Sequence, residues 1–284
     1  MLDKGFKDLG NFTKPVLVFG GPYGNLQATT ALLAQAAALN IGPENIICTG
    51  DVVAYCGEPA ATLEAIRAAG IHVVMGNCEE SLGNDRQDCG CGFDAGSACD
   101  VLSVQWFAHA SRSLNDDAKQ WMADLPRGLT FTMNNRRIAV IHGGTDEIGR
   151  FIFNSTPAAD KRREIDNLSV DGVIGGHCGL PFSADVDGRL WHNPGVIGMP
   201  ANDATPRTWF SILTPSPEGI DFVLQPLVYD HVKAARRLRQ EGLPEPYATT
   251  LETGLWPNMD VLPPAERAGQ GRALMPERFF WAKG

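Results

Sequence analysis

A strand–loop–helix unit that repeats through the N-terminal half of the chain constrains the fold most strongly. Apolar runs at 16–19, 45–49 and 71–75 predict short strands, and the segments 26–39 and 59–69 predict helices between them. Units of this kind at this spacing are typical of parallel βαβ architecture. The sequence therefore predicts an α/β fold.

Each of these strands is followed by a short polar loop. The loops contain residues 20–25, the pair Gly50-Asp51 and the pair Gly76-Asn77. Open α/β sheets bind their ligands beyond the carboxyl ends of the strands. We therefore expect these loops to form one functional site.

The second half of the chain predicts mainly antiparallel strands. Segments 129–133 and 137–141 are joined by Asn134-Asn135, a favourable hairpin turn. A helix is expected at 157–168. Further strands are expected at 172–174, 189–192, 208–213 and 219–227. Two of the predicted strands end at histidines, His142 and His177.

Four polar side chains at strand ends form a candidate metal site: Asp51, Asn77, His142 and His177. One carboxylate, one amide oxygen and two imidazoles suit Mn, Fe or Zn better than Ca or Mg, which prefer oxygen ligands only. A lone histidine at a strand end is more often structural than a ligand. The combination of four such loops is what predicts a metal centre.

Six short stretches occur in a fixed order, at 21–25, 50–51, 76–79, 142–143, 176–179 and 193–195. Their order and wording resemble the calcineurin-like metallophosphoesterase family, whose motifs run D-x-H-G-N, G-D, G-N-[HC]-[DE], H-G, G-H-x-H and N-P-G. The resemblance covers roughly residues 16–227. It implies a four-layer αββα sandwich of two mixed sheets and the activity of a phosphatase or phosphodiesterase.

The departures from these motifs affect the ligand positions of only one of the family's two metals. The three ligands exclusive to the family's first metal correspond here to Gly21, Tyr23 and Gly179. The four positions that hold the second metal are all retained. Because random decay would damage both sets, the resemblance implies a site redesigned for one divalent transition metal ion per chain (Mn, Fe or Zn).

Two alternatives remain for the first metal position. Tyr23 either ligates a hard ion through its phenolate or fills the space left by a histidine. The filling role is favoured because glycine at the other two positions removes donors. Cysteines are the other candidate ligands for a rebuilt site, namely Cys78, Cys89, Cys91 and Cys178.

The resemblance also suggests catalytic and substrate-binding roles. Cys78 stands where many relatives carry a histidine beside the phosphate, and its thiol is either a weak proton donor or a packing group. Asn25 and His142 are expected to assist catalysis. Asn25 and Arg207 are expected to bind substrate.

A glycine- and cysteine-rich insertion is expected at about 83–100. Cys89, Cys91 and Cys99 lack the doubled C-x-x-C spacing of a zinc ribbon, so they bind a soft metal, form a redox pair or are incidental thiols. The chain has seven cysteines and no apolar leader. We therefore expect a cytoplasmic protein whose cysteines serve other purposes than disulfides.

Two regions are expected, a metallophosphoesterase domain at 1–228 and a C-terminal region at 229–284. The latter contains a helix at 230–241 and a proline-rich arm with aromatic anchors. Aromatic residues are depleted in disordered segments. The arm is therefore expected to pack on its own domain or on a neighbour, which would give a homo-oligomer.

The net charge of −9 and the pI near 5.1 disfavour nucleic acid and anionic lipid as partners. No apolar stretch approaches the roughly 18 residues of a membrane helix. We expect a metal-dependent hydrolase of a small phosphate monoester or diester. The alternatives are a non-catalytic binding or scaffold protein and redox chemistry that uses the cysteine loop.

Overall fold

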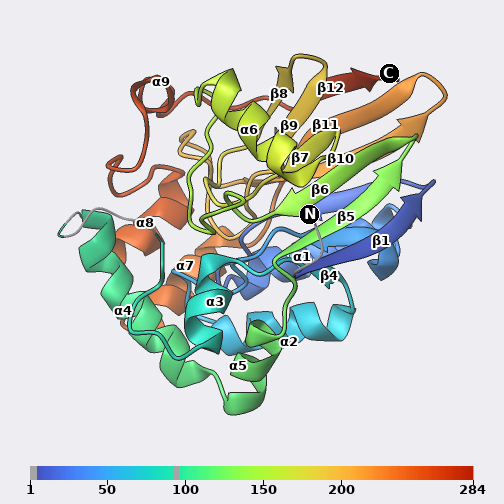
Figure 1. Ribbon diagram of the computed structural model, residues 1–284. Coiled ribbons are helices and arrows are strands. Elements are labelled where there is room, and N and C mark those ends of the chain that lie inside the picture. Colours follow the sequence, from blue (N-terminus) through green and yellow to red (C-terminus); the bar gives the residue numbers. More distant parts are fainter. Residues whose placement is uncertain (1–4, 92–95, 97, 284) are drawn as a thin grey trace.

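Two six-stranded sheets face each other in a computed structural model that describes residues 5–91, 96 and 98–283 (Figure 1). The first sheet has the order β1 (Phe6–Phe12), β5 (Gly128–Met133), β6 (Arg136–Ile141), β7 (Gly172–Ile174), β9 (Arg189–Asn193) and β8 (Phe182–Val186). The second has the order β12 (Glu277–Ala282), β11 (Gly219–Leu227), β10 (Thr208–Ser216), β2 (Val16–Phe19), β3 (Ile46–Cys48) and β4 (His72–Val73).

Both sheets are mixed. The β2–β3–β4 pairings are parallel, whereas β10, β11 and β12 pair in antiparallel fashion. In the first sheet, β6–β7, β7–β9 and β1–β5 are parallel and the hairpins β5–β6 and β8–β9 are antiparallel. The α/β class and the two mixed sheets expected from the sequence are confirmed.

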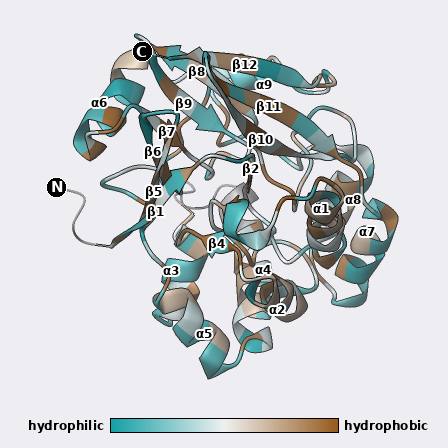
Figure 2. Ribbon diagram, turned by 90° about the vertical axis from the view of Figure 1, so that its right-hand side faces the viewer, coloured by the Kyte–Doolittle hydropathy of each residue, from teal (hydrophilic) through white to brown (hydrophobic). Residues whose placement is uncertain are grey.

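Side chains of a strand point alternately to the two faces of its sheet, and this alternation explains the layered arrangement. Val16 and Val18 join the core between the sheets, while Leu17 and Phe19 join the core under the helices of the second sheet. Successive strand side chains point to opposite faces, so one buried strand serves both cores. The result is four layers, with α6 (Ala158–Leu168) on one outer side and α1 (Leu26–Ala38) and α7 (His231–Gln240) on the other (Figure 2).

The remaining helices are α2 (Pro59–Ala69), α3 (Asn77–Gly83), α4 (Ala98–Ser113), α5 (Asp116–Ala123), α8 (Glu245–Thr253), α9 (Pro264–Arg267) and a short 3₁₀ turn at Pro43–Asn45. Asn25 caps α1 by accepting a hydrogen bond from the Ala28 amide at 3.1 Å. No helix within 5–91 and 98–283 is long and apolar enough to cross a membrane.

The C-terminal region packs on the rest of the same chain. Leu238 of α7 and Leu251 of α8 belong to the core that covers the second sheet, and β12 is the edge strand of that sheet. Trp256 donates from its indole to the Pro200 carbonyl at 2.7 Å. Homo-oligomerisation through this arm stays a prediction.

The cysteine insertion differs from expectation in one respect: Cys89 and Cys91 form a disulfide bond. The expectation that the cysteines avoid disulfides is therefore wrong for this pair. The loop begins after α3, and α4 occupies the end of the predicted insertion. Residues 92–95 and 97 and the side chain of Cys99 lie outside the described part of the chain.

Candidate metal centre

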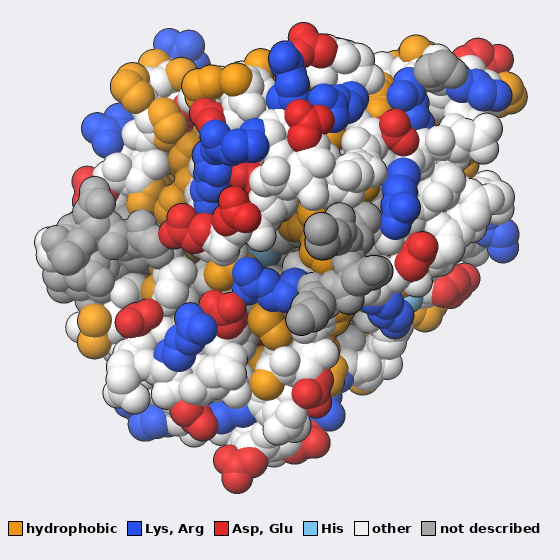
Figure 3. Space-filling view, in the orientation of Figure 1, with side chains coloured by type: hydrophobic (Ala, Val, Ile, Leu, Met, Phe, Trp, Pro, Cys, Tyr) orange, Lys and Arg blue, Asp and Glu red, His pale blue; other side chains and the backbone are white. Residues whose placement is uncertain are grey.

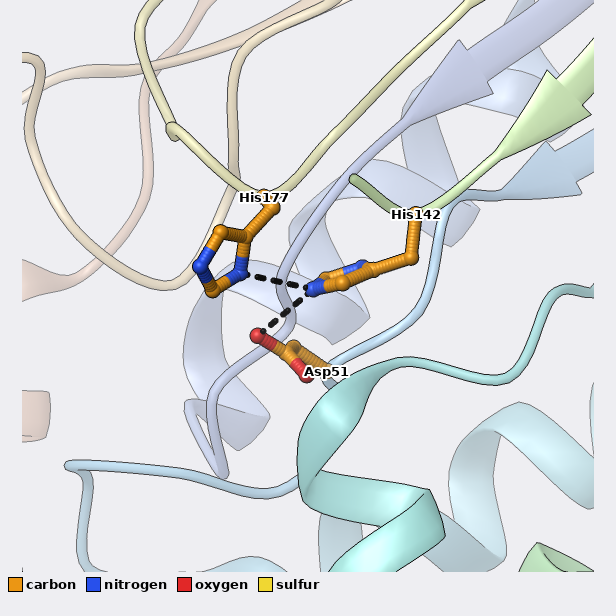
Figure 4. Close-up of side chains that lie close together, drawn as sticks. All are labelled: Asp51, His142 and His177. Carbon is orange, nitrogen blue, oxygen red and sulfur yellow. Dashed lines mark hydrogen bonds and ion pairs between the residues drawn. The ribbon is translucent and has the colours of Figure 1, made fainter. Parts of the chain in front are cut away.

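Four side chains from four loops converge beyond the ends of strands in both sheets. Asp51 follows β3, Asn77 opens α3, His142 follows β6 and His177 follows β7. One ligand atom from each of Asp51, His142 and His177 lies within 4.8 Å of the others (Figure 4). The Asn77 amide oxygen lies 2.9 Å from His142 Nε2. These are the four residues that the sequence predicted to hold a metal.

His142 shows what the cluster requires. Its Nδ1 lies 2.8 Å from the Thr49 carbonyl, so Nδ1 carries the proton and donates to that oxygen. Its Nε2 then presents a lone pair to Asp51 Oδ2 at 3.3 Å, Asn77 Oδ1 and His177 Nδ1 at 2.9 Å. A cation would satisfy the lone pair of His142 Nε2 together with the oxygens of Asp51 and Asn77, and a carbonyl bond on the second nitrogen is usual for a metal-binding histidine.

The charges of the cluster agree with this interpretation. Although burial opposes ionisation, His142 and His177 lower the pKa of Asp51 to about 2. Burial lowers the pKa of His142, but the Asp51 carboxylate outweighs it and the net effect is a rise. Burial and His142 lower the pKa of His177 to about 3. The Asp51 carboxylate and the two imidazoles therefore act strongly on one another's charge, as expected of groups that meet at one buried point.

A buried carboxylate, Glu79, holds two of the ligand loops together. Its oxygens accept hydrogen bonds from the amides of Asp51, Val52 and Gly76, each at 2.8 Å. Gly76 needs to be glycine because a Cβ there would lie 2.3 Å from Asp51 Oδ1. Glu79 thus fixes the distance between Asp51 and the start of α3.

The first metal position, defined by residues 21, 23 and 179, is occupied by a phenol ring. A Cβ on Gly21 would lie 2.5 Å from Tyr23 Cζ, and a Cβ on Gly179 would lie 3.8 Å from the Tyr23 hydroxyl. The ring packs edge-on against Tyr55, with centroids 4.8 Å apart. Burial, and then the Asp51 charge, raise the pKa of Tyr23 well above its usual value. This packing favours the space-filling role of Tyr23.

Beside the centre lies a cavity of about 100 Å³, which we call the aromatic cavity. Asp51 and His177 line it on one side, and Tyr23, Tyr55 and Phe151 form part of its wall. Its other lining residues are Cys178, Gly179, Val196, Met199, Tyr247, Thr250, Trp256, Pro257, Asn258 and Val261. Residues 247–261 belong to the C-terminal region, which therefore covers the site. On the face shown in Figure 3, acidic and basic side chains are interspersed.

Comparison with known proteins agrees with this geometry. A family model described as the calcineurin-like phosphoesterase superfamily domain matches residues 24–215. The chain belongs to the calcineurin-like phosphoesterase superfamily. The family expected from the six sequence motifs is thereby confirmed.

Two solved structures share the fold of this chain, and one curated protein is similar to it in sequence. A metallophosphoesterase from Sphaerobacter thermophilus has a TM-score of 0.67 and 21% identity, with 86% of this chain and 100% of that chain covered. The hypothetical protein PH1004 from Pyrococcus horikoshii has a TM-score of 0.69 and 18% identity, with 85% and 99% covered. The uncharacterized protein MJ0912 of Methanocaldococcus jannaschii is 24% identical over 248 residues, which are 81% of this chain and 94% of that protein.

The two residues predicted to bind substrate, Asn25 and Arg207, have partners within the chain. The Asn25 amide donates to the Gly198 carbonyl at 3.1 Å, and its oxygen caps α1. Arg207 lies 3.5 Å from Asp203, packs over the Trp209 ring and donates to the Leu274 carbonyl. Neither residue lines the aromatic cavity. Their roles in substrate binding stay predictions.

The cysteines surround the centre without offering ready thiolates. Burial, then Asp51, raise the pKa of the Cys78 thiol well above its usual value, which disfavours a thiolate ligand and leaves its roles as proton donor or packing group as predictions. Burial raises the pKa of Cys178 to about 12. Cys89 and Cys91 are joined to each other, so neither is free to bind a metal as a thiolate. The Cys89 carbonyl instead accepts from Asn77 Nδ2 at 2.8 Å and orients that amide.

Three contributions to the site were not predictable from the sequence. Glu79 was given no role, because its bonds to three amides depend on the exact approach of two loops. The Thr49 carbonyl was not considered because a backbone atom leaves no sequence signal. Tyr247 and Trp256 were seen only as part of an arm, and their return over the metal centre is a feature of the tertiary structure.

Proposed function

We propose that this phosphoesterase hydrolyses a small phosphate monoester or diester and uses one divalent transition metal ion, Mn, Fe or Zn. The observation that carries the proposal is the contrast between the two halves of the site. Four donors converge at one position, and a tyrosine ring fills the other.

A bound ion supplies Lewis acidity to a phosphoryl oxygen and to water. Among the four ligands only Asp51 is charged, so a divalent ion in this site keeps a net positive charge that attracts the phosphate. Thr49 and Glu79 act through their neighbours: Thr49 holds the tautomer of His142, and Glu79 holds the loop of Asp51. Both are positioning residues that keep the ligand atoms in place.

The test begins with the metal content of the purified protein after incubation with Mn, measured by elemental analysis. We expect about one ion per chain, and Asp51→Asn should abolish binding because the only charged ligand is lost. His192→Gln is the matched control, since His192 is also fully buried but contacts Ser183, away from the centre. Two bound ions, or unchanged binding in Asp51→Asn, would contradict the ligand assignment.

Activity is measured separately on phenyl phosphate and on a generic phosphodiester. Turnover that requires the single ion supports hydrolysis. One bound ion without turnover on any ester, together with a specific protein partner, would favour the non-catalytic scaffold function. Bound iron with a visible absorption band would favour the redox alternative.

A cytoplasmic location remains part of the proposal. The Cys89–Cys91 disulfide bears on it, because disulfides in cytosolic proteins of mesophiles are usually transient or regulatory. Thiol labelling of the protein in rapidly quenched cells would show whether this pair is oxidised there.

A further inference from the structure

The aromatic cavity adjoins the metal centre at the first metal position. Asp51 and His177, two of the four ligands, line both the centre and the cavity. Phe151 packs against His177 with ring centroids 4.3 Å apart, so an aromatic wall begins directly at a ligand. A group attached to a phosphate at the centre would therefore extend into this space.

The chemistry of the lining defines what fits. Five aromatic rings line the cavity, from Tyr23, Tyr55, Phe151, Tyr247 and Trp256. Among its described lining residues there is no lysine or arginine, and the one carboxylate is Asp51. A second anionic group placed here would lack a counter-charge and lose its water, which is costly. Aromatic walls instead favour a flat uncharged ring, packed edge-to-face or offset.

The size of the cavity limits the group further. Its volume is about 100 Å³. A protein cavity of roughly 150 Å³ is known to hold benzene. One ring therefore fills the space after small side-chain movements, whereas a fused or larger group would need the C-terminal arm to shift.

We infer that the aromatic cavity binds a single uncharged aromatic ring carried by a substrate with one phosphate group. This inference rests on the proposed function, because it assumes that the phosphate lies at the metal centre. Tyr23 determines this preference. At the first metal position, where the family binds a positively charged ion, this chain has the apolar ring of Tyr23. Polyphosphates are disfavoured because a second phosphate in the cavity would meet no lysine or arginine among its described lining residues.

Binding of non-hydrolysable phosphonates tests the inference without any turnover. Calorimetry on the Mn-loaded protein should show phenylphosphonate binding about ten- to a hundredfold more tightly than methylphosphonate, because the ring leaves water. Pyrophosphate should bind no better than methylphosphonate. Equal affinities for the phenyl and methyl compounds, or a preference for pyrophosphate, would overturn the inference.

A cavity-filling variant tests whether the phenyl ring of phenylphosphonate binds in the aromatic cavity. Val261→Phe adds a ring from the C-terminal arm, and it should lower phenylphosphonate affinity at least about tenfold while methylphosphonate and Mn binding stay unchanged. Unchanged phenylphosphonate affinity in a variant that still binds Mn would count against the cavity. Val232→Phe, an exposed position on α7, is the matched control.

Neutral phenol separates the two proposals. Phenol binding needs no metal ion, so it reports on the cavity alone. Chemical shifts of the wild type and of Val261→Phe measure this binding. Binding of phenol and phenylphosphonate without hydrolysis of any ester would leave the cavity inference standing and remove the proposed function. The cavity inference would be contradicted if phenol did not bind, or if Val261→Phe did not block its binding.

Discussion

The Tyr23 ring lies where a side chain at position 21 would have to go. Its backbone has φ near 54°, a left-handed conformation that is unusual for a tyrosine, and Gly21 beside it has φ near 33°. Residues 21 and 23 are thus coupled, because the ring is accommodated only while position 21 has no side chain.

We expect Gly21→Ala to lower the free energy of unfolding by about 2–4 kcal/mol, since a Cβ would overlap the ring and strain the backbone. Urea unfolding measures the change. Adding Tyr23→Ala should recover part of the loss, because the overlap is relieved and only the strain remains. A Gly21→Ala variant as stable as the wild type would show that the ring moves aside easily.

His192 gives a prediction on pH dependence. Burial lowers the pKa of this histidine to about 3 from its ordinary value of 6.5. Between these values the unfolded chain binds a proton that the folded chain excludes, so stability falls as the pH falls from about 6.5 toward 3. The contribution of one such group is at most about 1.4 kcal/mol per pH unit.

His192→Gln should therefore make the decline of stability below pH 6.5 shallower, as measured by urea unfolding across that range. Phe222→Leu is the control, because it removes the ring that packs against His192 and adds no titrating group. Its cost should be similar at each pH. Parallel pH profiles for the wild type and His192→Gln would contradict the assignment.

At the scale of elements, Glu79 links the end of β3 to the start of α3 through three amide hydrogen bonds. Glu79→Gln replaces an acceptor oxygen by an amide donor that faces backbone donors. We expect a loss of about 2–4 kcal/mol of stability. Mn affinity should fall as well, by about tenfold or more, because Asp51 is no longer fixed. Metal titration and urea unfolding measure the two effects.

Glu80→Gln is the matched control for this prediction. The neighbouring carboxylate pairs with Arg86 and Arg127 near the surface. Partly exposed ion pairs contribute about 0–1 kcal/mol, so this variant should change stability little and leave Mn affinity intact. Equal effects at positions 79 and 80 would refute a special role for Glu79.

The elements with strong local signals were predictable from the sequence. The range Pro59–Ala69 of α2 has proline in its first turn and glycine after its end, and the prediction matched the structure. The strands β2, β7 and β11 also matched at both ends. By contrast, β1 has mostly exposed residues and β12 lies in a charged, aromatic segment, so neither shows a clean alternation. Both are stabilised by pairing with distant strands, which no local pattern reveals.

The site was predictable where a ligand-type side chain lies at the end of a predicted strand or the start of a predicted helix. The four converging donors each follow or open a regular element and have ligand-type side chains. The predicted roles of Asn25 and Arg207 came from motif position alone and stay predictions; in the structure Asn25 donates to the Gly198 carbonyl and Arg207 pairs with Asp203. The aromatic cavity was not foreseen because its wall joins residues 23 and 256, more than two hundred positions apart in the chain.

At the scale of the whole molecule, Trp281 connects the two sheets. It lies on β12 in the second sheet, is buried in the core between the sheets and donates to the Gly188 carbonyl of the β8–β9 turn at 3.0 Å. Trp281→Ala should cost about 3–5 kcal/mol, measured by thermal or urea unfolding. Phe280→Ala, at the adjacent half-exposed position, should cost far less. Similar losses would mean that β12 matters only through its backbone pairing.

The return of the C-terminal arm over the metal centre has a consequence for biosynthesis. All four ligands lie between positions 51 and 177, whereas Tyr247 and Trp256 emerge from the ribosome later. We expect a nascent chain to acquire metal affinity before it can distinguish one organic group from another. Ribosome-stalled chains of increasing length, probed with phenylphosphonate and methylphosphonate, would show selectivity only after the arm has been released.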